Sequence, residues 1–324
     1  MDVFGFAVSA GGDFLRAAAV DAAHELAIFD TLARGPATLD ELADVARIAP
    51  RGNTRRTHRL RALLDVLVAI GAIARSPDGP AFTTAPTPPP PRPVVARAGW
   101  GLMAEVIRSD RPLHPEGGEL ERRYHLHLAR AGAAAARELA PFFGTTSLVD
   151  LGGGAGTYTA AFLDAAPPSA TAILVDFGDV LAIARHQLAD FGGRVSYRDG
   201  DARAVDAGTG HGAALLANVL HLHSPAICAG LCAAAARAVA SSSGPGGVVV
   251  VKDLRVDEDR SGPLEGLLFA LNMAIYTGEG DVYPTSQLRA WLAAAGLAHI
   301  DEHRLAAAPD AVVLVARRGE PASG

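Results

Sequence analysis

The stretch Leu148–Gly156, which reads LVDLGGGAG, decides the fold of this 324-residue chain. Its apolar first half is typical of a buried strand, and its glycines predict a turn that leads into a helix over 158–165. Glycines at such a turn let the backbone approach a ligand closely and adopt φ values that other residues resist. The turn alone does not identify the ligand, because dinucleotide-binding enzymes also use one.

Short β-rich runs alternate with helical patterns around and beyond this turn. The first five runs are Ser147–Leu151, Ala172–Asp176, Arg194–Tyr197, Ala213–Leu220 and Val248–Leu254. A late pair of runs at 298–304 and 311–316 follows a helix expected over 285–295. Such alternation predicts a mostly parallel sheet covered by helices on both faces, to which the late pair adds an antiparallel last strand. We therefore expect an α/β fold with a doubly wound, Rossmann-like sheet.

A proline-rich run, PTPPPPRP at 86–93, marks the clearest break in the chain. Proline lacks a backbone N–H and favours extended geometry, so this run is typical of a semi-rigid spacer. We expect a helical domain over 1–85, a linker with further helices that cover the site over 86–143, and the sheet domain over 144–324.

The first 85 residues show the pattern of three helices followed by a small β-wing. Helices are expected over 13–33, after the N-cap residue Thr38 and over 54–71, and a turn at 77–79 separates two short strands. Two functions are open for this winged-helix-like shape, namely DNA binding and dimerisation. The first is favoured by a cluster of arginines near the third helix, at Arg51, Arg55, Arg56, Arg59 and Arg61.

Charge and composition narrow the class of protein. The formal net charge of −6 and a pI near 6.0 disfavour binding to a phosphate backbone, so we expect no nucleic-acid partner. We find no run of eighteen apolar residues and no signal-peptide pattern at the start, and we expect a soluble, cytoplasmic protein without membrane contact. Cys228 and Cys232 fall on one helical face and are expected to be reduced thiols.

Acidic residues follow the second and third predicted strands. Asp176 closes the second strand, where a carboxylate can accept hydrogen bonds from ribose hydroxyls. Asp201 follows the third strand at the same edge of the sheet and could receive the amino group of adenine. Together they fit an adenosine that carries no phosphate, because a pyrophosphate is more often bound by a helix N-terminus. The alternative is that both are solvated strand ends.

These motifs resemble those of class I S-adenosylmethionine methyltransferases of the dimeric plant and bacterial O-methyltransferase type. The resemblance rests on VDLGGGAG (149–156), VDFGDVLAIA (175–184), DGDA (199–202), HELAIFDTLARGPATLDELA (24–43) and the segment 270–297. It implies a homodimer formed through the N-terminal domain. It also implies S-adenosyl-L-methionine as cofactor, with Phe177 beside the adenine. The implied cofactor-binding residues are Gly152, Gly154, Gly156, Asp176, Phe177, Asp201, Ala202 and Asn218.

The resemblance also implies a general base. In the family a histidine follows the fourth strand, and here ANVLHLHSP (217–225) places His221 there. An imidazole suits this role because its ordinary pKa, near ~6.5, lets it accept a proton at neutral pH. Asp253 matches a carboxylate that orients the base. Leu222 and His223 depart from the family's usual Asp and Trp, and Val282 stands in place of a second orienting glutamate, which weakens the O-methyl assignment.

Several alternatives stay open at this stage. His221 and His223, with His125 and His127, could converge on a metal, but helical i,i+2 spacing separates the last two and we predict no ligand set. Two further hypotheses are that the enzyme methylates carbon or nitrogen, and that the protein is a winged-helix regulator that senses S-adenosylmethionine. A dehydrogenase is the weakest of the alternative hypotheses. A small, hydroxylated, aromatic or natural-product-like acceptor is expected in an apolar pocket, although a stripe at helical spacing is usually core. The expected lining residues are Trp100, Met103, Tyr124, Phe269, Asn272, Met273 and Tyr276.

Overall fold

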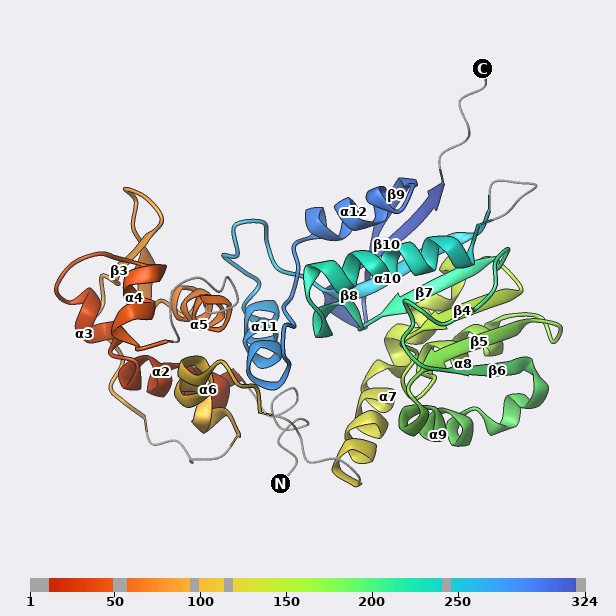
Figure 1. The fold of residues 1–324 in the computed structure, drawn as a ribbon, viewed down its shortest axis with the longest axis horizontal. Coiled ribbons are helices and arrows are strands. Elements are labelled where there is room, and N and C mark those ends of the chain that lie inside the picture. The colour runs from red at the N-terminus through yellow and green to blue at the C-terminus, as the bar shows by residue number, and fades with distance from the viewer. Residues whose placement is uncertain (1–11, 49–56, 94–98, 114–118, 241–245, 319–324) are drawn as a thin grey trace, which may run out of the picture. The chain divides into compact units, whose positions relative to one another are not determined.

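The computed structural model describes residues 12–48, 57–93, 99–113, 119–240 and 246–318 (Figure 1). The side chains of 12–13, 119–125 and 127 lie outside this description. The chain forms two compact units: the first comprises Met1–Pro115 with Val256–Val282, and the second Glu116–Arg255 with Tyr283–Gly324. The segment Val256–Val282 thus belongs to the first unit, whereas the three-part division expected from the sequence assigned it to the sheet domain. That division into domains stays a prediction.

Helices dominate the first unit, as the N-terminal pattern predicts. They are α2 (Gly12–Glu25), α3 (Ile28–Leu32), α4 (Leu39–Val45), α5 (His58–Ala69), α6 (Met103–Ser109) after the short 3-10 helix η2 (Gly99–Leu102), and α11 (Leu264–Tyr276). Three short antiparallel strands, β1 (Ala37–Thr38), β2 (Ile73–Arg75) and β3 (Ala81–Thr84), form a sheet in the order β1-β3-β2. The β2–β3 hairpin is the expected wing.

Local sequence accounts for two features of this unit. Thr38 and Glu41 form a capping box at the start of α4: the Thr38 hydroxyl accepts from the Glu41 N–H at 3.3 Å, and Glu41 Oε2 accepts from the Thr38 N–H at 2.7 Å. The proline-rich run lies against α2, because Arg92 Nε donates to Asp21 Oδ1 at 2.7 Å and His24 Nε2 is 2.9 Å from the Pro90 carbonyl oxygen.

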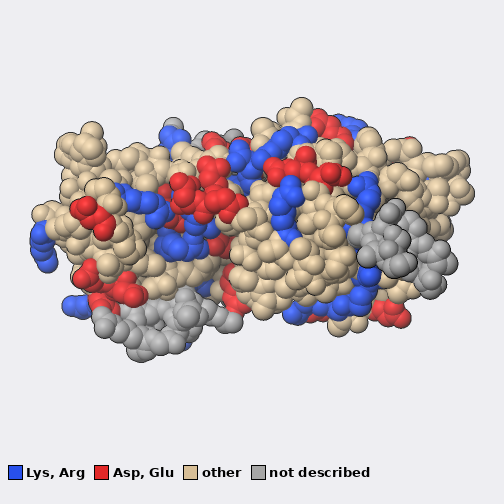
Figure 2. All heavy atoms as spheres, turned by 90° about the horizontal axis from the view of Figure 1, so that it is seen from above, with Lys and Arg blue, Asp and Glu red and all other residues tan. Residues whose placement is uncertain are grey.

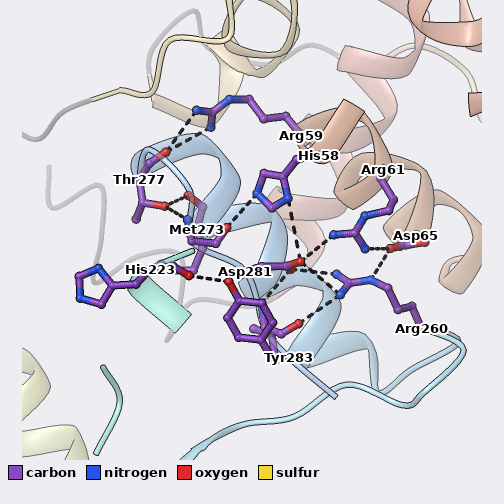
Figure 3. A network of polar contacts seen from close by, with 12 residues as sticks. His58, Arg59, Arg61, Asp65, His223, Arg260, Met273, Thr277, Asp281 and Tyr283 are labelled. Atoms are coloured by element: carbon purple, nitrogen blue, oxygen red, sulfur yellow. Dashed lines mark hydrogen bonds and ion pairs between the residues drawn. The ribbon is translucent and has the colours of Figure 1, made fainter. Parts of the chain in front are cut away.

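A buried ion network ties the segment 256–282 to α5 (Figure 3). Asp65 Oδ2 accepts a hydrogen bond from Arg260 Nε at 2.6 Å, and Asp65 Oδ1 accepts one from Arg75 Nη2 at 2.7 Å. Asp281 accepts from Arg61 Nη2 at 2.6 Å and from Arg260 Nη2 at 3.0 Å. Two buried carboxylates therefore share three arginines, which satisfies charges that burial would otherwise penalise.

The second unit contains a seven-stranded sheet in the order β6-β5-β4-β7-β8-β10-β9. The strands are β4 (Ser147–Leu151), β5 (Thr171–Asp176), β6 (Val195–Asp199), β7 (Ala213–Ala217), β8 (Val248–Leu254), β9 (Leu297–Leu305) and β10 (Ala308–Arg318). Strands β4 to β8 are parallel, and β10 pairs antiparallel with both β8 and β9. This confirms the doubly wound α/β fold. The order reverses between β4 and β7, and folds of this kind bind ligands at such a switch point.

Helices cover both faces of this sheet (Figure 1). One face packs against α10 (Pro225–Ala238) and α12 (Thr285–Ala294), and the other against α7 (Glu119–Leu139), α8 (Thr157–Ala165) and α9 (Gly178–Gln187). The fourth strand is shorter than the predicted run 213–220. It ends at Ala217 because Asn218 adopts the left-handed conformation (φ 55°), after which Leu220–Leu222 form the 3-10 helix η5.

Among the described residues, no helix has both the length and the apolar character needed to cross a membrane. On the face drawn in Figure 2, cationic and anionic side chains are interspersed, and among its coloured residues we see no extended basic surface of the kind that binds a phosphate backbone.

Candidate functional site

The glycine-rich turn after β4 supplies the first part of the candidate site. Gly152 has φ 73°, and a Cβ added there would lie 2.8 Å from Val219 Cγ2. Gly156 has φ 83°, and its added Cβ would lie 2.5 Å from Leu188 Cδ1. Gly154 also has a positive φ, of 56°, but nothing described lies within 4 Å of its added Cβ. Two of the three glycines are therefore required by packing, and the third exposes open backbone.

Asp176 at the end of β5 is bonded to this turn. Its Oδ2 accepts from the Gly154 N–H at 2.8 Å and its Oδ1 accepts from the Phe177 N–H at 2.7 Å. The Phe177 ring, at the N-cap of α9, is 61% exposed although it is a large apolar group. An oriented carboxylate and an exposed aromatic ring thus stand together at the carboxyl edge of the sheet.

Asp150 is a buried carboxylate beneath the glycine-rich turn, and it was not among the expected site residues. Its Oδ2 accepts from the Thr159 hydroxyl at 2.7 Å, and a Cβ on Gly153 would lie 2.9 Å from its Cγ. Burial raises the pKa of Asp150 to about 7, and the nearby Asp176 carboxylate raises it further, while the Thr159 hydrogen bond opposes the shift. The signal in the sequence was an aspartate inside an otherwise apolar strand.

Asp201 already has a partner within the chain. Its carboxylate accepts from the Arg203 backbone N–H at 2.8 Å and from Arg203 Nε at 2.9 and 3.0 Å, and Arg203 Nη2 adds a further contact. These hydrogen bonds lower the pKa of Asp201. Arg203 was not among the expected site residues, and its position two residues after the aspartate was the available signal. Ala202, between them, is half-buried.

His221 and Asp253 form a buried dyad at the ends of two adjacent strands. His221 Nδ1 lies 2.5 Å from Asp253 Oδ1, and the His221 backbone N–H donates to Asp253 Oδ2 at 3.2 Å. Burial raises the pKa of Asp253, but His221 and Lys252 outweigh it, so the pKa is lowered and the carboxylate is ionised. His221 Nδ1 therefore carries the proton of this hydrogen bond, which fixes the tautomer and the orientation of the ring.

A second polar group occupies the other face of the same strand ends. Lys252 Nζ donates to Asn218 Oδ1 at 2.6 Å, and Asn218 Nδ2 donates to the Tyr158 hydroxyl at 3.4 Å. Tyr158 belongs to the first turn of α8, directly after the glycines. Asn218 was expected at the site, whereas Lys252 and Tyr158 were not.

The other histidines do not form a described cluster. His223 is half-buried, and burial, Arg203 and His221 lower its pKa. The side chains of His125 and His127 lie outside the described residues. Among side chains that are described, no group of three or more histidine, cysteine or acidic residues is arranged to hold a metal ion.

Six of the seven expected acceptor-binding residues lie in the first unit, and the side chain of Tyr124 lies outside the described residues. Trp100 Nε1 donates to Asn272 Oδ1 at 3.2 Å, and both side chains are buried. Met103, Met273 and Tyr276 are also buried, and Phe269 is half-buried. Val282 is fully buried in this unit, and Leu222 in the second unit is 38% exposed.

Comparison with known proteins shows that this chain is similar in sequence and in fold to O-methyltransferases. The sequence model of the O-methyltransferase domain matches residues 127–298. The 3-hydroxy-5-methyl-1-naphthoate 3-O-methyltransferase of Streptomyces sahachiroi is 30% identical over 222 residues, which are 64% of this chain and 63% of that protein. Acetylserotonin O-methyltransferase of Bos taurus is 35% identical over 187 residues, 57% of this chain and 51% of that protein. The chain thus spans about half to two thirds of the length of these relatives.

A solved structure shares the whole fold. It is an O-methyltransferase family 2 protein from Planctomyces limnophilus in complex with apigenin, with a TM-score of 0.68 and 23% sequence identity. The superposition covers 98% of this chain and 97% of that one.

Proposed function

This chain belongs to the O-methyltransferase domain family, and from that premise we propose that it transfers the methyl group of S-adenosyl-L-methionine to a hydroxyl of a small aromatic acceptor. The acceptor class is extended from the relatives: one is named as a 3-O-methyltransferase of a hydroxynaphthoate, and a structural neighbour was solved with apigenin. The observation that carries the proposal is the His221–Asp253 dyad beside the glycine-rich turn.

The residues around the turn fit an adenosyl cofactor without phosphates. Gly154 offers open backbone, the Asp176 carboxylate is oriented toward the same turn, and the exposed Phe177 ring offers an apolar surface for an adenine. Asp201 would reach the adenine amino group after releasing some of its contacts with Arg203. The cofactor, when bound, supplies an electrophilic methyl group on a sulfonium.

In this proposal His221 accepts the proton of the acceptor hydroxyl. Its Nδ1 is held by the ionised Asp253, so Nε2 is the nitrogen that takes the proton. Asp253 stabilises the imidazolium that forms and keeps the ring aimed, as a carboxylate does for a histidine base in other enzymes. Loss of the hydroxyl proton to His221 Nε2 would leave the acceptor oxygen as the stronger nucleophile that methyl transfer needs.

Calorimetric titration with S-adenosylmethionine, S-adenosylhomocysteine and NAD tests the cofactor half of the proposal. We expect micromolar binding of both sulfur compounds and none of NAD, unchanged after treatment with a chelator. If neither sulfur compound bound, the proposed function would be refuted. If binding were lost after treatment with the chelator, a metal-assisted reaction would be favoured.

Turnover of phenolic acceptors by His221→Ala tests the role of the base. We expect kcat to fall by roughly 10²–10⁴, the usual contribution of a positioned general base, while cofactor affinity stays within about twofold. His299→Ala, an exposed histidine on β9, is the matched control and should keep its activity. If His221→Ala turned over like the control, transfer to carbon or nitrogen without this base would replace the O-methyl assignment. The exposed Leu222 and the apolar Val282 favour that second candidate.

A homodimer formed through the N-terminal domain is the proposed assembly. It rests on the family resemblance, and the exposed apolar side chains of Phe14 and Val45 on α2 and α4 support it. Light scattering measures the mass directly.

A further inference from the structure

Lys252 is the only lysine of this chain: it is one of 29 basic residues, and the other 28 are arginines. It lies on β8 and is 7% exposed. An ammonium is a compact charge on an unbranched stem, whereas a guanidinium is a wide planar fork with five donors. A chain that uses arginine everywhere else therefore carries lysine at a buried position that calls for a single, narrow cation.

Lys252 is bonded to Asn218 through both its side chain and its backbone. Lys252 Nζ donates to Asn218 Oδ1 at 2.6 Å, and the Lys252 carbonyl oxygen accepts from the Asn218 N–H at 2.8 Å. Asn218 has φ 55°, in the left-handed region that asparagine adopts more readily than most other non-glycine residues, and its side-chain contacts stabilise it there. Its Nδ2 donates in turn to Tyr158 at 3.4 Å. Lys252 is thus part of what keeps Asn218 in this conformation.

The turn that Asn218 begins contacts the glycine-rich turn and also carries the proposed base, His221. Val219 packs on the glycine-rich turn, because a Cβ on Gly152 would lie 2.8 Å from Val219 Cγ2. Two residues later, His221 bonds Asp253 through its ring and its backbone N–H. A change in the φ of Asn218 would therefore displace the base relative to the glycine-rich turn.

Adjacent residues of a strand point to opposite faces of its sheet, and here both act on the same turn. Lys252 lies on the face of Val250, which packs with α7 and α8, and Asp253 lies on the face of Val249 and Val251, which pack with α10. The ammonium bonds Asn218 from one side and the carboxylate bonds His221 from the other. The end of β8 thus holds the turn 218–221 from both faces.

We propose that Lys252 is a positioning residue for the reaction. Its ammonium holds Asn218 in the left-handed conformation and so sets the position of His221 relative to the glycine-rich turn. The inference rests on the proposed function for its catalytic meaning, while the contact itself can be tested without turnover. Burial lowers the pKa of the Lys252 ammonium and Asp253 opposes the shift, so its titration reports on this environment.

A single lysine makes that titration direct. Protein labelled with lysine carrying ¹³C at Cε gives one Cε resonance, whose pH dependence is the titration of Lys252. Asn218→Gly removes the acceptor of the ammonium while glycine tolerates a positive φ, so we expect the pKa of Lys252 to fall by about half a unit or more. An unchanged titration in Asn218→Gly would overturn the inference whatever the enzyme's activity.

A double-mutant cycle then tests the catalytic consequence. Lys252→Met keeps an unbranched stem without charge, and we expect kcat to fall about tenfold or more with a change of less than about threefold in the acceptor KM, since small misplacements of a base are costly. In the Asn218→Gly background the same substitution should cost less than about twofold. Lys252→Arg should not restore kcat, and Arg317→Met, on the exposed end of β10, is the control.

Equal losses for Lys252→Met in both backgrounds, or full activity of Lys252→Met, would refute the positioning role. These outcomes are distinct from a failure of the proposed function, in which the wild-type protein itself neither binds S-adenosylmethionine nor methylates a phenol. Circular dichroism and the melting temperature of each variant separate a lost fold from a lost position.

Discussion

Asp150→Asn should change how stability depends on pH. The Asp150 carboxyl is fully buried, accepts a hydrogen bond from Thr159 and has its pKa raised from an ordinary 3.8 to about 7, chiefly by burial. Asparagine has nearly the same shape and can accept the same hydrogen bond, but it does not titrate. The comparison therefore isolates the free energy of ionising this one buried carboxyl.

The magnitude follows from linkage. At low pH the carboxyl is protonated in both the folded and the unfolded chain and costs nothing. As pH rises past 3.8 the unfolded chain releases the proton first, so the free energy of unfolding falls by up to about 1.4 kcal/mol per pH unit until the folded carboxyl ionises near pH 7. A shift of roughly three units thus amounts to about 4 kcal/mol, of which about 2.3 kcal/mol falls between pH 5 and 7.

Urea denaturation at pH 5, 6, 7 and 8 measures this difference. We expect the stability of Asp150→Asn relative to wild type to rise from pH 5 to 7 and to stay level above pH 7. Asp301→Asn, which removes an exposed carboxyl on β9, serves as the control and should follow the wild-type curve within about 0.5 kcal/mol. Parallel curves for wild type and Asp150→Asn across the whole range would show that Asp150 does not titrate as its burial implies.

Four further outcomes are expected elsewhere in the protein. Gly156→Ala should lose roughly 2–4 kcal/mol of stability in urea melts, because its Cβ would lie 2.5 Å from Leu188 at a φ of 83°. Arg203→Met should tighten S-adenosylmethionine binding by no more than about fivefold in calorimetry, since exposed ion pairs such as that of Arg203 with Asp201 are weak; weaker binding would show that Arg203 helps to hold the cofactor. Asp253→Asn should lower kcat by about 10²-fold or more while cofactor affinity changes little, and an unaltered kcat would separate the dyad from catalysis. Light scattering should give twice the chain mass, and a monomeric mass would contradict the proposed dimer.

Local features of the sequence were enough to predict much of the second unit. The glycines of LVDLGGGAG need positive φ values at three positions, and strand and helix periodicities alternate clearly on either side of them. The position of His221 was also predictable, but the predicted strand continued to residue 220. The apolar residues on both sides of Asn218 hid the strand end, although an asparagine is a residue that adopts the left-handed conformation which ends β7.

Other parts of the site depend on residues far apart in the chain. The pairing of Asn218 with Lys252 joins residues 34 positions apart and follows from the register of β7 on β8, in which Ala217 lies opposite Lys252. The hydrogen bonds of Asp201 with Arg203 are local, but hydrophobic periodicity carries no signal for them.

By itself the sequence determined the class of fold, the glycine-rich turn and the strand ends at which acidic and histidine side chains gather, because glycine content and side-chain periodicity act over a few neighbouring residues. The tertiary structure alone decided that Val256–Val282 returns to the first unit, that Asp150 is buried with a raised pKa, and that the one lysine reaches Asn218. Each of these depends on which strands and helices pack side by side, and that choice is made by the free energy of the whole core rather than by any local stretch.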